Sequence, residues 1–157
     1  MMNFPFFITL FKNYIEIKYS SCMVKMRQIL IIGNNDNGCT PEIEKIAYDA
    51  GKHVAESNSV LITGGLGGVM KAASHGAKDA NGLTIGIIPQ DDSSLANEYC
   101  DIVIPSGMGL SRDFLNALSA DGVIVIGGGS GTLSEICAAY MYKKPIATIK
   151  NSGGMAT

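Results

Sequence analysis

Short runs of valine, isoleucine and leucine alternate along the chain with longer segments in which apolar residues recur every three or four positions. This alternation is typical of repeated β-α units, which build a parallel sheet. Six apolar runs have the length of strands, and most are nearly continuous, as expected for strands that are buried on both faces. The predicted strands cover residues 28–32, 59–63, 83–88, 101–104, 122–126 and 145–149.

Four helices are predicted between these strands. The first begins at Thr40, a residue type that caps helices, and Pro41 suits the first helical position. The others are predicted at residues 68–80, 110–118 and 133–142, where small or apolar residues recur at helical spacing. We therefore predict an α/β fold: a Rossmann-like, doubly wound domain whose mainly parallel sheet carries helices on both faces. The short polar segment after the last strand predicts that a final helix is lacking.

The amino-terminal segment lies outside this pattern. Its apolar run at residues 4–11 is too short to span a bilayer and lacks the features of a secretory signal. Regular patterning begins only at Met26. We expect residues 1–25 to be an extension that is not part of the fold, and residues 26–157 to form one domain.

Composition narrows the possible partners. A chain of 157 residues is long enough for one compact domain and too short for two ordinary ones. The 46% hydrophobic and 17% charged fractions favour a sheet buried on both faces. A formal net charge of -2 offers no basic surface for a phosphate backbone, so we expect no nucleic-acid partner. No segment predicts a membrane partner.

The spacing of cysteines and histidines predicts no metal site. The four cysteines contain no C-x-x-C pair, and His53 and His75 lie in separate predicted helices. Scattered cysteines of this kind are typical of a reducing compartment, so we expect a cytoplasmic protein.

Two predicted strands run directly into glycine-rich turns that open helices. Such turns expose backbone N–H groups at the positive end of a helix and bind phosphate. Both turns follow strand carboxyl ends, so we expect them to face one crevice and hold a phosphorylated, nucleotide-like ligand. The alternative is that the glycines only make tight turns. The candidate residues are Gly64, Gly65, Gly67, Gly68, Val69 and Met70 in the first turn and Gly128, Gly129, Ser130, Gly131 and Thr132 in the second, with Gly33 of the first β-α turn in second rank.

Neither turn matches the common nucleotide motifs. No lysine completes a P-loop, and the turn at Gly33 is not G-x-G-x-x-G. ATP hydrolysis and ordinary NAD binding are therefore disfavoured.

From residue 27 to residue 150 the chain resembles the lonely-guy (LOG) superfamily, which includes molybdenum cofactor carrier relatives. The segment from Gly128 to Glu135 is similar to the P-G-G-x-G-T-x-x-E motif of the superfamily, with Gly127 in place of the proline. The turn at residues 63–70 is similar to its first phosphate loop, and Ser111 and Arg112 to its arginine segment. These motifs together are specific for the superfamily.

The resemblance implies one of two functions. One is phosphoribohydrolase activity, in which Glu135 and Arg112 are catalytic and the N-glycosidic bond of a nucleoside 5'-monophosphate is cleaved. The other is a non-catalytic carrier or sensor of the molybdenum cofactor or another nucleotide or pterin phosphate. In the hydrolase branch a lysine follows the arginine, whereas here Asp113 does. This departure, together with the lost proline, resembles the carrier-like and uncharacterised branches more closely, while the retained Arg112 and Glu135 favour the hydrolase. Neither function requires a cofactor, and the resemblance implies a homodimer or larger homo-oligomer.

Two of these side chains have structural alternatives. Thr132 and Glu135 have the spacing of a capping box, in which the glutamate satisfies the amide of the N-cap residue. Arg112 could be a solvated residue at a helix start, although a cation there opposes the helix dipole and favours an anionic partner. Asn116 lies one helical turn further on and is a second-rank candidate.

Overall fold

The computed structural model describes residues 25–156, so the expected extension lies outside the described residues except for Lys25. Six strands form one parallel sheet in the order β4-β3-β2-β1-β5-β6. Their bounds agree with the predicted strands to within one residue at each end, which confirms those predictions. The strands are β1 Gln28–Gly33, β2 Val60–Thr63, β3 Thr84–Ile88, β4 Ile102–Pro105, β5 Gly122–Ile126 and β6 Ile146–Thr148.

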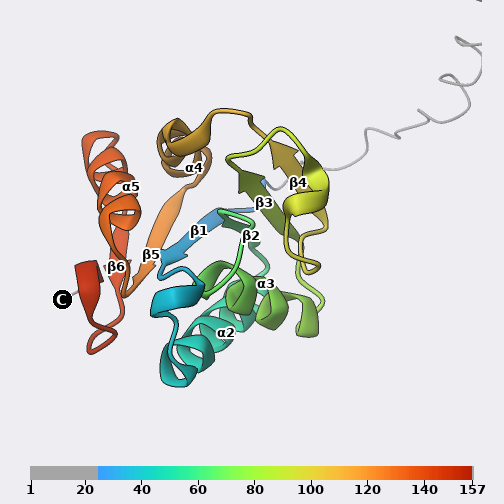
Figure 1. The fold of residues 1–157 in the computed structure, drawn as a ribbon. Helices are drawn as coiled ribbons and strands as arrows, with labels where there is room; N and C mark the ends of the chain where they lie inside the picture. The colour runs from blue at the N-terminus through green and yellow to red at the C-terminus, as the bar shows by residue number, and fades with distance from the viewer. Residues whose placement is uncertain (1–24, 157) are drawn as a thin grey trace, which may run out of the picture.

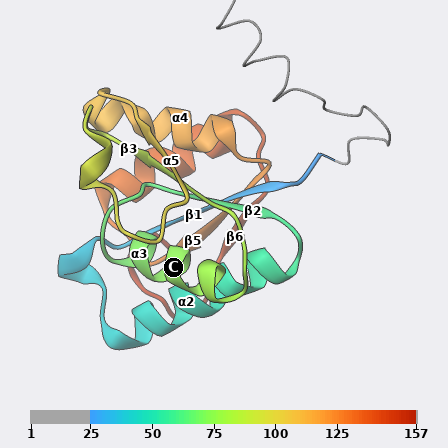
Figure 2. The ribbon, with the colours of Figure 1, turned by 90° about the vertical axis from the view of Figure 1, so that its right-hand side faces the viewer.

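Four α-helices cover the sheet in two layers, one on each face (Figures 1 and 2). Helices α2 and α3 lie on one face, and α4 and α5 lie on the other. This arrangement confirms the predicted Rossmann-like α/β fold. The helices are α2 Pro41–Glu56, α3 Val69–Asp79, α4 Arg112–Ser119 and α5 Ser130–Met141. None of the helices within residues 25–156 has the length and apolar character needed to cross a membrane.

The predicted start of the last helix is wrong. Helix α5 begins at Ser130, three residues before the predicted start at Leu133. Gly127 and Gly128 take positive φ angles of 62° and 100° and make the turn out of β5 by themselves. The chain is therefore already helical when it reaches Thr132.

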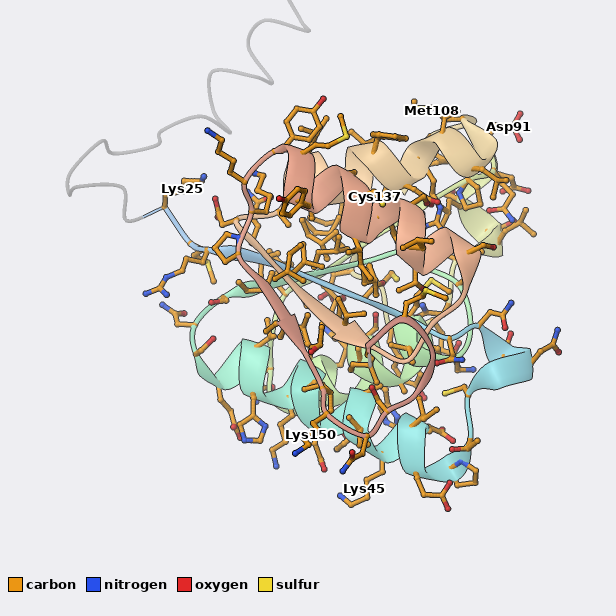
Figure 3. All side chains as sticks on the ribbon, turned by 90° about the vertical axis from the view of Figure 1, so that its left-hand side faces the viewer. Lys25, Lys45, Asp91, Met108, Cys137 and Lys150 are labelled. Atoms are coloured by element: carbon orange, nitrogen blue, oxygen red, sulfur yellow. The ribbon has the colours of Figure 1, made fainter. Side chains whose placement is uncertain are left out.

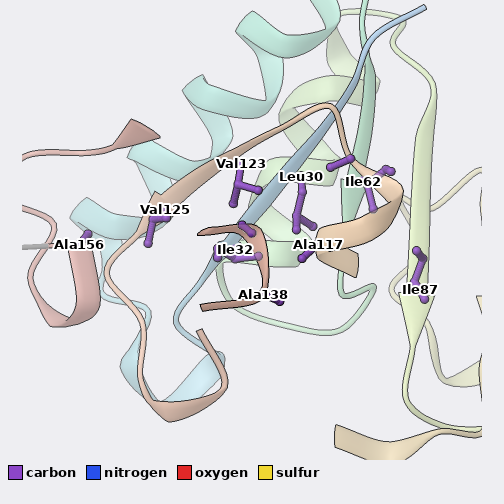
Figure 4. Close-up of a cluster of buried hydrophobic side chains, with 11 residues drawn as sticks. Leu30, Ile32, Ile62, Ile87, Ala117, Val123, Val125, Ala138 and Ala156 are labelled. Carbon is purple, nitrogen blue, oxygen red and sulfur yellow. The ribbon is translucent and has the colours of Figure 1, made fainter. Parts of the chain in front are cut away.

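Two hydrophobic cores lie on opposite faces of the sheet because successive strand residues point in opposite directions. Leu30 and Ile32 of β1 pack towards α4 and α5, where they meet Ala117 and Ala138 (Figure 4). Ile31, between them, packs towards α2 and α3. The central strands are buried on both faces, as predicted.

The two edge strands differ from that prediction. Ile102 and Ile104 of β4 are 44% and 41% exposed, and β6 is largely exposed as well. Their sequences are apolar, but each has a neighbouring strand on one side only. An apolar run alone does not distinguish an edge strand from a central one.

Helices α2 and α3 approach each other very closely. A Cβ atom on Gly51 of α2 would lie 1.9 Å from the carbonyl oxygen of Ala73 in α3. A Cβ on Gly76 of α3 would lie 1.9 Å from the carbonyl oxygen of Tyr48 in α2. Only glycine fits at these two crossing points without moving a backbone.

The strand order reverses between β1 and β5. Strands β1 to β4 are added successively in one direction, and β5 returns to pair with β1 on its other side. In open parallel sheets, ligands bind outside the carboxyl ends of the strands at such a reversal. The turns after β1, β2 and β5 all lie at this edge.

Candidate functional site

Asn34, directly after β1, connects the two predicted glycine loops. Its side-chain Oδ1 accepts a hydrogen bond of 2.7 Å from the amide of Gly128. Its backbone carbonyl accepts one of 2.9 Å from the amide of Val69. The two loops that we expected to face one crevice are therefore held together by one residue at the carboxyl edge of the sheet.

In the loop after β2, the amides of Gly65, Gly68 and Val69 are bonded within the protein. Gly68 donates to Oδ1 of Asp36 at 2.7 Å, and Gly65 donates to Oγ1 of Thr63 at 3.1 Å. A Cβ on Gly67 would overlap the carboxylate of Asp36. Asp36 thus places a negative charge at the start of α3, where a phosphate was expected.

The loop after β5 is more open. Its first two amides are bonded, Gly127 to Oγ of Ser152 at 2.9 Å and Gly128 to Asn34. A Cβ on Gly129 would meet no atom within 4 Å, and one on Gly131 would meet only Oδ2 of Asp113, at 3.9 Å. Neither position has a left-handed φ, so neither packing nor backbone conformation requires glycine there. The absent side chains leave free space at the start of α5.

The amino terminus of α5 carries no side-chain cap from any described residue. Gly129 is the N-cap residue and makes no capping bond, and Gly129, Ser130 and Gly131 are exposed. The first amides of a helix have no partner within the helix and attract anions. This turn is consequently the best anion site at the carboxyl edge.

Thr132 was predicted to bind phosphate, but its hydroxyl is bonded within the protein. Its side chain is 4% exposed, and its hydroxyl donates a 3.2 Å hydrogen bond to the carbonyl oxygen of Gly33 in β1. The hydroxyl therefore holds α5 against the central strand.

Glu135 is not part of a capping box, so that alternative is wrong. The N-cap residue is Gly129, and Oε1 of Glu135 instead accepts a 2.8 Å hydrogen bond from Nδ2 of Asn116 in α4. Burial raises the pKa of Glu135 to about 7, against the lowering effect of the bond from Asn116. Asp113 raises this pKa further and Arg112 lowers it. A buried carboxyl group that titrates near neutrality lies beneath the open turn.

Arg112 is not a solvated helix-start residue. Its Nη1 donates to the carbonyl oxygens of Gly64, at 2.7 Å, and Ile87, at 2.5 Å. These carbonyls lie at the ends of β2 and β3, so the guanidinium stays at the carboxyl edge. Burial lowers its pKa, and the nearby carboxylates of Glu135 and Asp113 raise it.

Asp113 and Asn116 connect α4 with α5. Oδ2 of Asp113, a residue that is only 6% exposed, accepts a hydrogen bond of 2.5 Å from Oγ of Ser134. Asn116 is completely buried, and its Oδ1 has no partner among the described residues. Asp113, where the resemblance implies lysine for a hydrolase, is thus a buried residue between two helices.

Three residues of the site were not predicted from the sequence: Asn34, Asp36 and Ser152. The polar run from Asn34 to Gly38, directly after a buried strand, was a signal that could have identified the first two. No pattern around Ser152 indicates that its hydroxyl reaches Gly127. Among the described residues, no group of three or more His, Cys, Asp or Glu side chains is placed to hold a metal ion.

The chain is similar in sequence and in structure to several known proteins. Residues 26–156 match the profile of the SLOG cluster4 family. The molybdenum cofactor binding protein of Rippkaea orientalis is 42% identical, with a TM-score of 0.76, covering 78% of this chain and 76% of that one. The molybdenum cofactor carrier protein of Chlamydomonas reinhardtii is 36% identical, with a TM-score of 0.73, covering 78% and 75%. An uncharacterised protein of Archaeoglobus fulgidus is 42% identical over 127 residues, which are 81% of this chain and 82% of that one.

Proposed function

The chain belongs to the SLOG cluster4 family, and on that premise we propose that it binds and carries a phosphorylated pterin of the molybdenum cofactor type without transforming it. Two similar structures, at 42% and 36% identity, are described as molybdenum cofactor binding and carrier proteins. The observation that carries the proposal is the free space at Gly129 and Gly131, beside the uncapped start of α5. Packing does not require glycine at these two positions, whereas the close approach of a bound phosphate to the backbone does.

The surrounding residues have separate tasks in this proposal. The open amides at Gly129 to Gly131 bind the phosphate, and Asn34 fixes the loop that presents them. The guanidinium of Arg112 supplies positive charge at the same edge and holds the loop after β2 in place. The protein works as a homodimer or larger homo-oligomer.

The test is the substitution Gly129→Asp. An aspartate at the N-cap bonds the first helical amides, so the free protein should be as stable as the wild type or slightly more stable. The same carboxylate occupies the anion site, so inorganic phosphate and a pterin monophosphate should no longer raise the melting temperature. For the wild type, a ligand at 100 times its Kd should stabilise the native state by about 2.7 kcal/mol.

The matched control is Asn58→Asp, which adds the same charge before β2, at the opposite edge of the sheet. Asn58 has a φ of 56°, which aspartate tolerates. This variant should keep the full ligand-induced shift. If Gly129→Asp binds phosphate as well as the control does, the site is not at the start of α5 and the proposal fails.

Nucleoside monophosphate hydrolysis is the second candidate, and the pKa of Glu135 favours it. A carboxyl group with a pKa of about 7 is suited to general acid-base catalysis at neutral pH. Release of free base from nucleoside monophosphates by the wild type, with a roughly 100-fold loss in Glu135→Gln, would establish this activity. If neither protein releases base and both bind phosphate esters, the carrier function is supported.

A further inference from the structure

The side chains of Asn116 and Glu135 meet in the buried contact between α4 and α5. Asn116 is completely buried, and Glu135 is 8% exposed. Nδ2 of Asn116 donates a 2.8 Å hydrogen bond to Oε1 of Glu135. The other end of the same amide, Oδ1, has no hydrogen-bond partner among the described residues. Because a buried oxygen without a donor is costly, the ionised form of this pair lacks one hydrogen-bond donor.

A proton on Glu135 supplies that donor. A carboxylate only accepts hydrogen bonds, whereas a protonated carboxyl group also donates one from its hydroxyl oxygen. The two oxygens of a carboxyl group match the oxygen and nitrogen of an amide in spacing, so a neutral acid and an amide bond at two points. In this arrangement Nδ2 of Asn116 donates to Oε1 of Glu135, and the protonated Oε2 donates to Oδ1 of Asn116. Both buried side chains then have partners.

The charged groups beside this pair lie on α4. Burial raises the pKa of Glu135 to about 7 against the bond from Asn116, and of the two charges Asp113 raises this pKa and Arg112 lowers it. Glu135 is the one charged residue of α5 itself. Strands β1, β3 and β6, which α4 and α5 pack against, contain no charged residue. The proton on Glu135 is therefore exchanged near neutral pH.

The charge on Glu135 affects the anion site at the start of α5. Glu135 follows Gly131 by four residues, so both lie on one side of the helix, one turn apart. An ionised Glu135 places a negative charge beneath the open amides and opposes the positive charge of Arg112. A protonated Glu135 leaves the guanidinium to the anion. An anion that binds the neutral form more tightly takes up a proton as it binds, because the two equilibria are linked.

We propose that Asn116 and Glu135 form this two-point pair, in which Glu135 holds a proton, and that the site binds its anionic ligand together with that proton. The second part rests on the proposed function. Asn116 acts as a positioning residue, because it holds the neutral acid beneath the turn and is itself completely buried. The affinity for a doubly charged anion should consequently fall as the pH rises.

The test measures the binding of sulfate by calorimetry between pH 6 and pH 8. Sulfate carries two charges, as phosphate does, but does not titrate in this range, so a proton that is taken up belongs to the protein. The wild type should lose affinity about tenfold across the range, a usual size for coupling between two sites. Titrations in two buffers of different ionisation enthalpy should show net proton uptake.

The variant Glu135→Gln keeps the shape of the pair and both of its bonds, because a glutamine amide accepts from Nδ2 and donates to Oδ1 of Asn116. This side chain is neutral at every pH. The variant should bind sulfate at pH 8 about as tightly as the wild type does at pH 6, without proton uptake. The matched control is Glu56→Gln, which makes the same change at an exposed position on α2 and should retain the pH dependence.

The pair can also be tested without a ligand. Infrared spectra at pH 6 should show the carbonyl band of one neutral carboxylic acid, which is lost at high pH and is absent in Glu135→Gln. In Asn116→Leu, which has a similar volume but no Oδ1, the acid loses its acceptor, so the band should move to higher frequency. A wild type without this band, or a band that Asn116→Leu leaves in place, overturns the pair.

The outcomes separate the coupling from the proposed function. A sulfate affinity that does not change with pH in the wild type overturns the coupling, and so does a pH dependence that persists in Glu135→Gln. If the acid band is present but the wild type binds neither sulfate nor phosphate at any pH, the pair stands, and the proposed function and the coupling both fail.

Discussion

The two helical layers cover the same sheet but present different surfaces to their surroundings. The exposed residues of α2, apart from Pro41, are all ionisable: Glu42, Glu44, Lys45, Lys52, His53 and Glu56. Those of α4 and α5 include no charged residue within residues 112–119 and 130–141. Figure 3 shows Lys45 on one layer and Cys137 on the other. Packing on the sheet explains the inner side of each layer but not this difference between the outer sides.

The layers also differ in how their helices meet. Helices α2 and α3 touch backbone to backbone at Gly51 and Gly76. Helices α4 and α5 are joined by polar side chains, through Ser134 to Asp113 and Asn116 to Glu135. Helices α2 and α3 also share one polar bond, from the hydroxyl of Tyr48 to Asp79, but it is exposed, whereas α4 and α5 enclose buried ionisable groups beside the open turn. Three stability measurements test this contrast.

The largest loss of stability is expected when alanine replaces a glycine at the crossing of α2 and α3. Gly51→Ala drives a methyl group into the carbonyl of Ala73 and should cost about 3 kcal/mol or more, despite the better helix propensity of alanine. Gly131→Ala meets only open space and should be neutral or stabilising by about 0.5 kcal/mol. Urea denaturation gives both values. Equal effects would show that the two layers are packed alike.

The second prediction concerns pH and the buried carboxyl group of Glu135. Its folded pKa of about 7 lies above the ordinary value of 4.5, so its contribution to stability is complete below pH 4.5 and is lost as pH rises through 7. When complete, this loss is about 3 kcal/mol. Glu135→Gln should remove it, so the variant should gain stability over the wild type between pH 5 and pH 8. If the free energies of unfolding of the wild type and of Glu135→Gln change with pH in the same way, the expected cost of the buried charge is contradicted.

The smallest effect is expected at the helix starts. Thr40 caps α2 by accepting from the amide of Ile43 at 3.4 Å, whereas Ser111 makes no capping bond to α4. Thr40→Ala should cost about 1 kcal/mol, and Ser111→Ala close to nothing. Thermal unfolding of the two variants measures the difference. If Ser111→Ala lost more stability than Thr40→Ala, Ser111 and not Thr40 would be the residue that caps its helix.

Most of the fold could be predicted because its signals are local. The apolar runs marked all six strands, and Thr40 with Pro41 marked the start of α2. The strand order could not be predicted from local signals, because a single apolar run does not indicate which other strand it pairs with. The exposure of β4 and β6 depends on that order.

The candidate site could be predicted only in outline. Glycine-rich turns located the two loops, but identical residues in them have different roles. Gly67 is required because Asp36 approaches it, and Gly129 faces open space. Asp36 lies far from Gly67 in the sequence, so no local pattern shows the approach. The error about Glu135 has the same origin, since its partner Asn116 belongs to another helix.

The position of β1 also has a consequence for the order in which the molecule folds. Ile29 pairs with Leu61 of β2 and with Gly122 of β5, at a much greater sequence separation. Closing the longer loop costs more entropy, and contacts of high sequence separation form slowly. We expect β1, β2 and their helices to assemble early and β5 to dock later. The bond from Gly128 to Asn34 forms only with that docking, so the candidate site is completed late in folding.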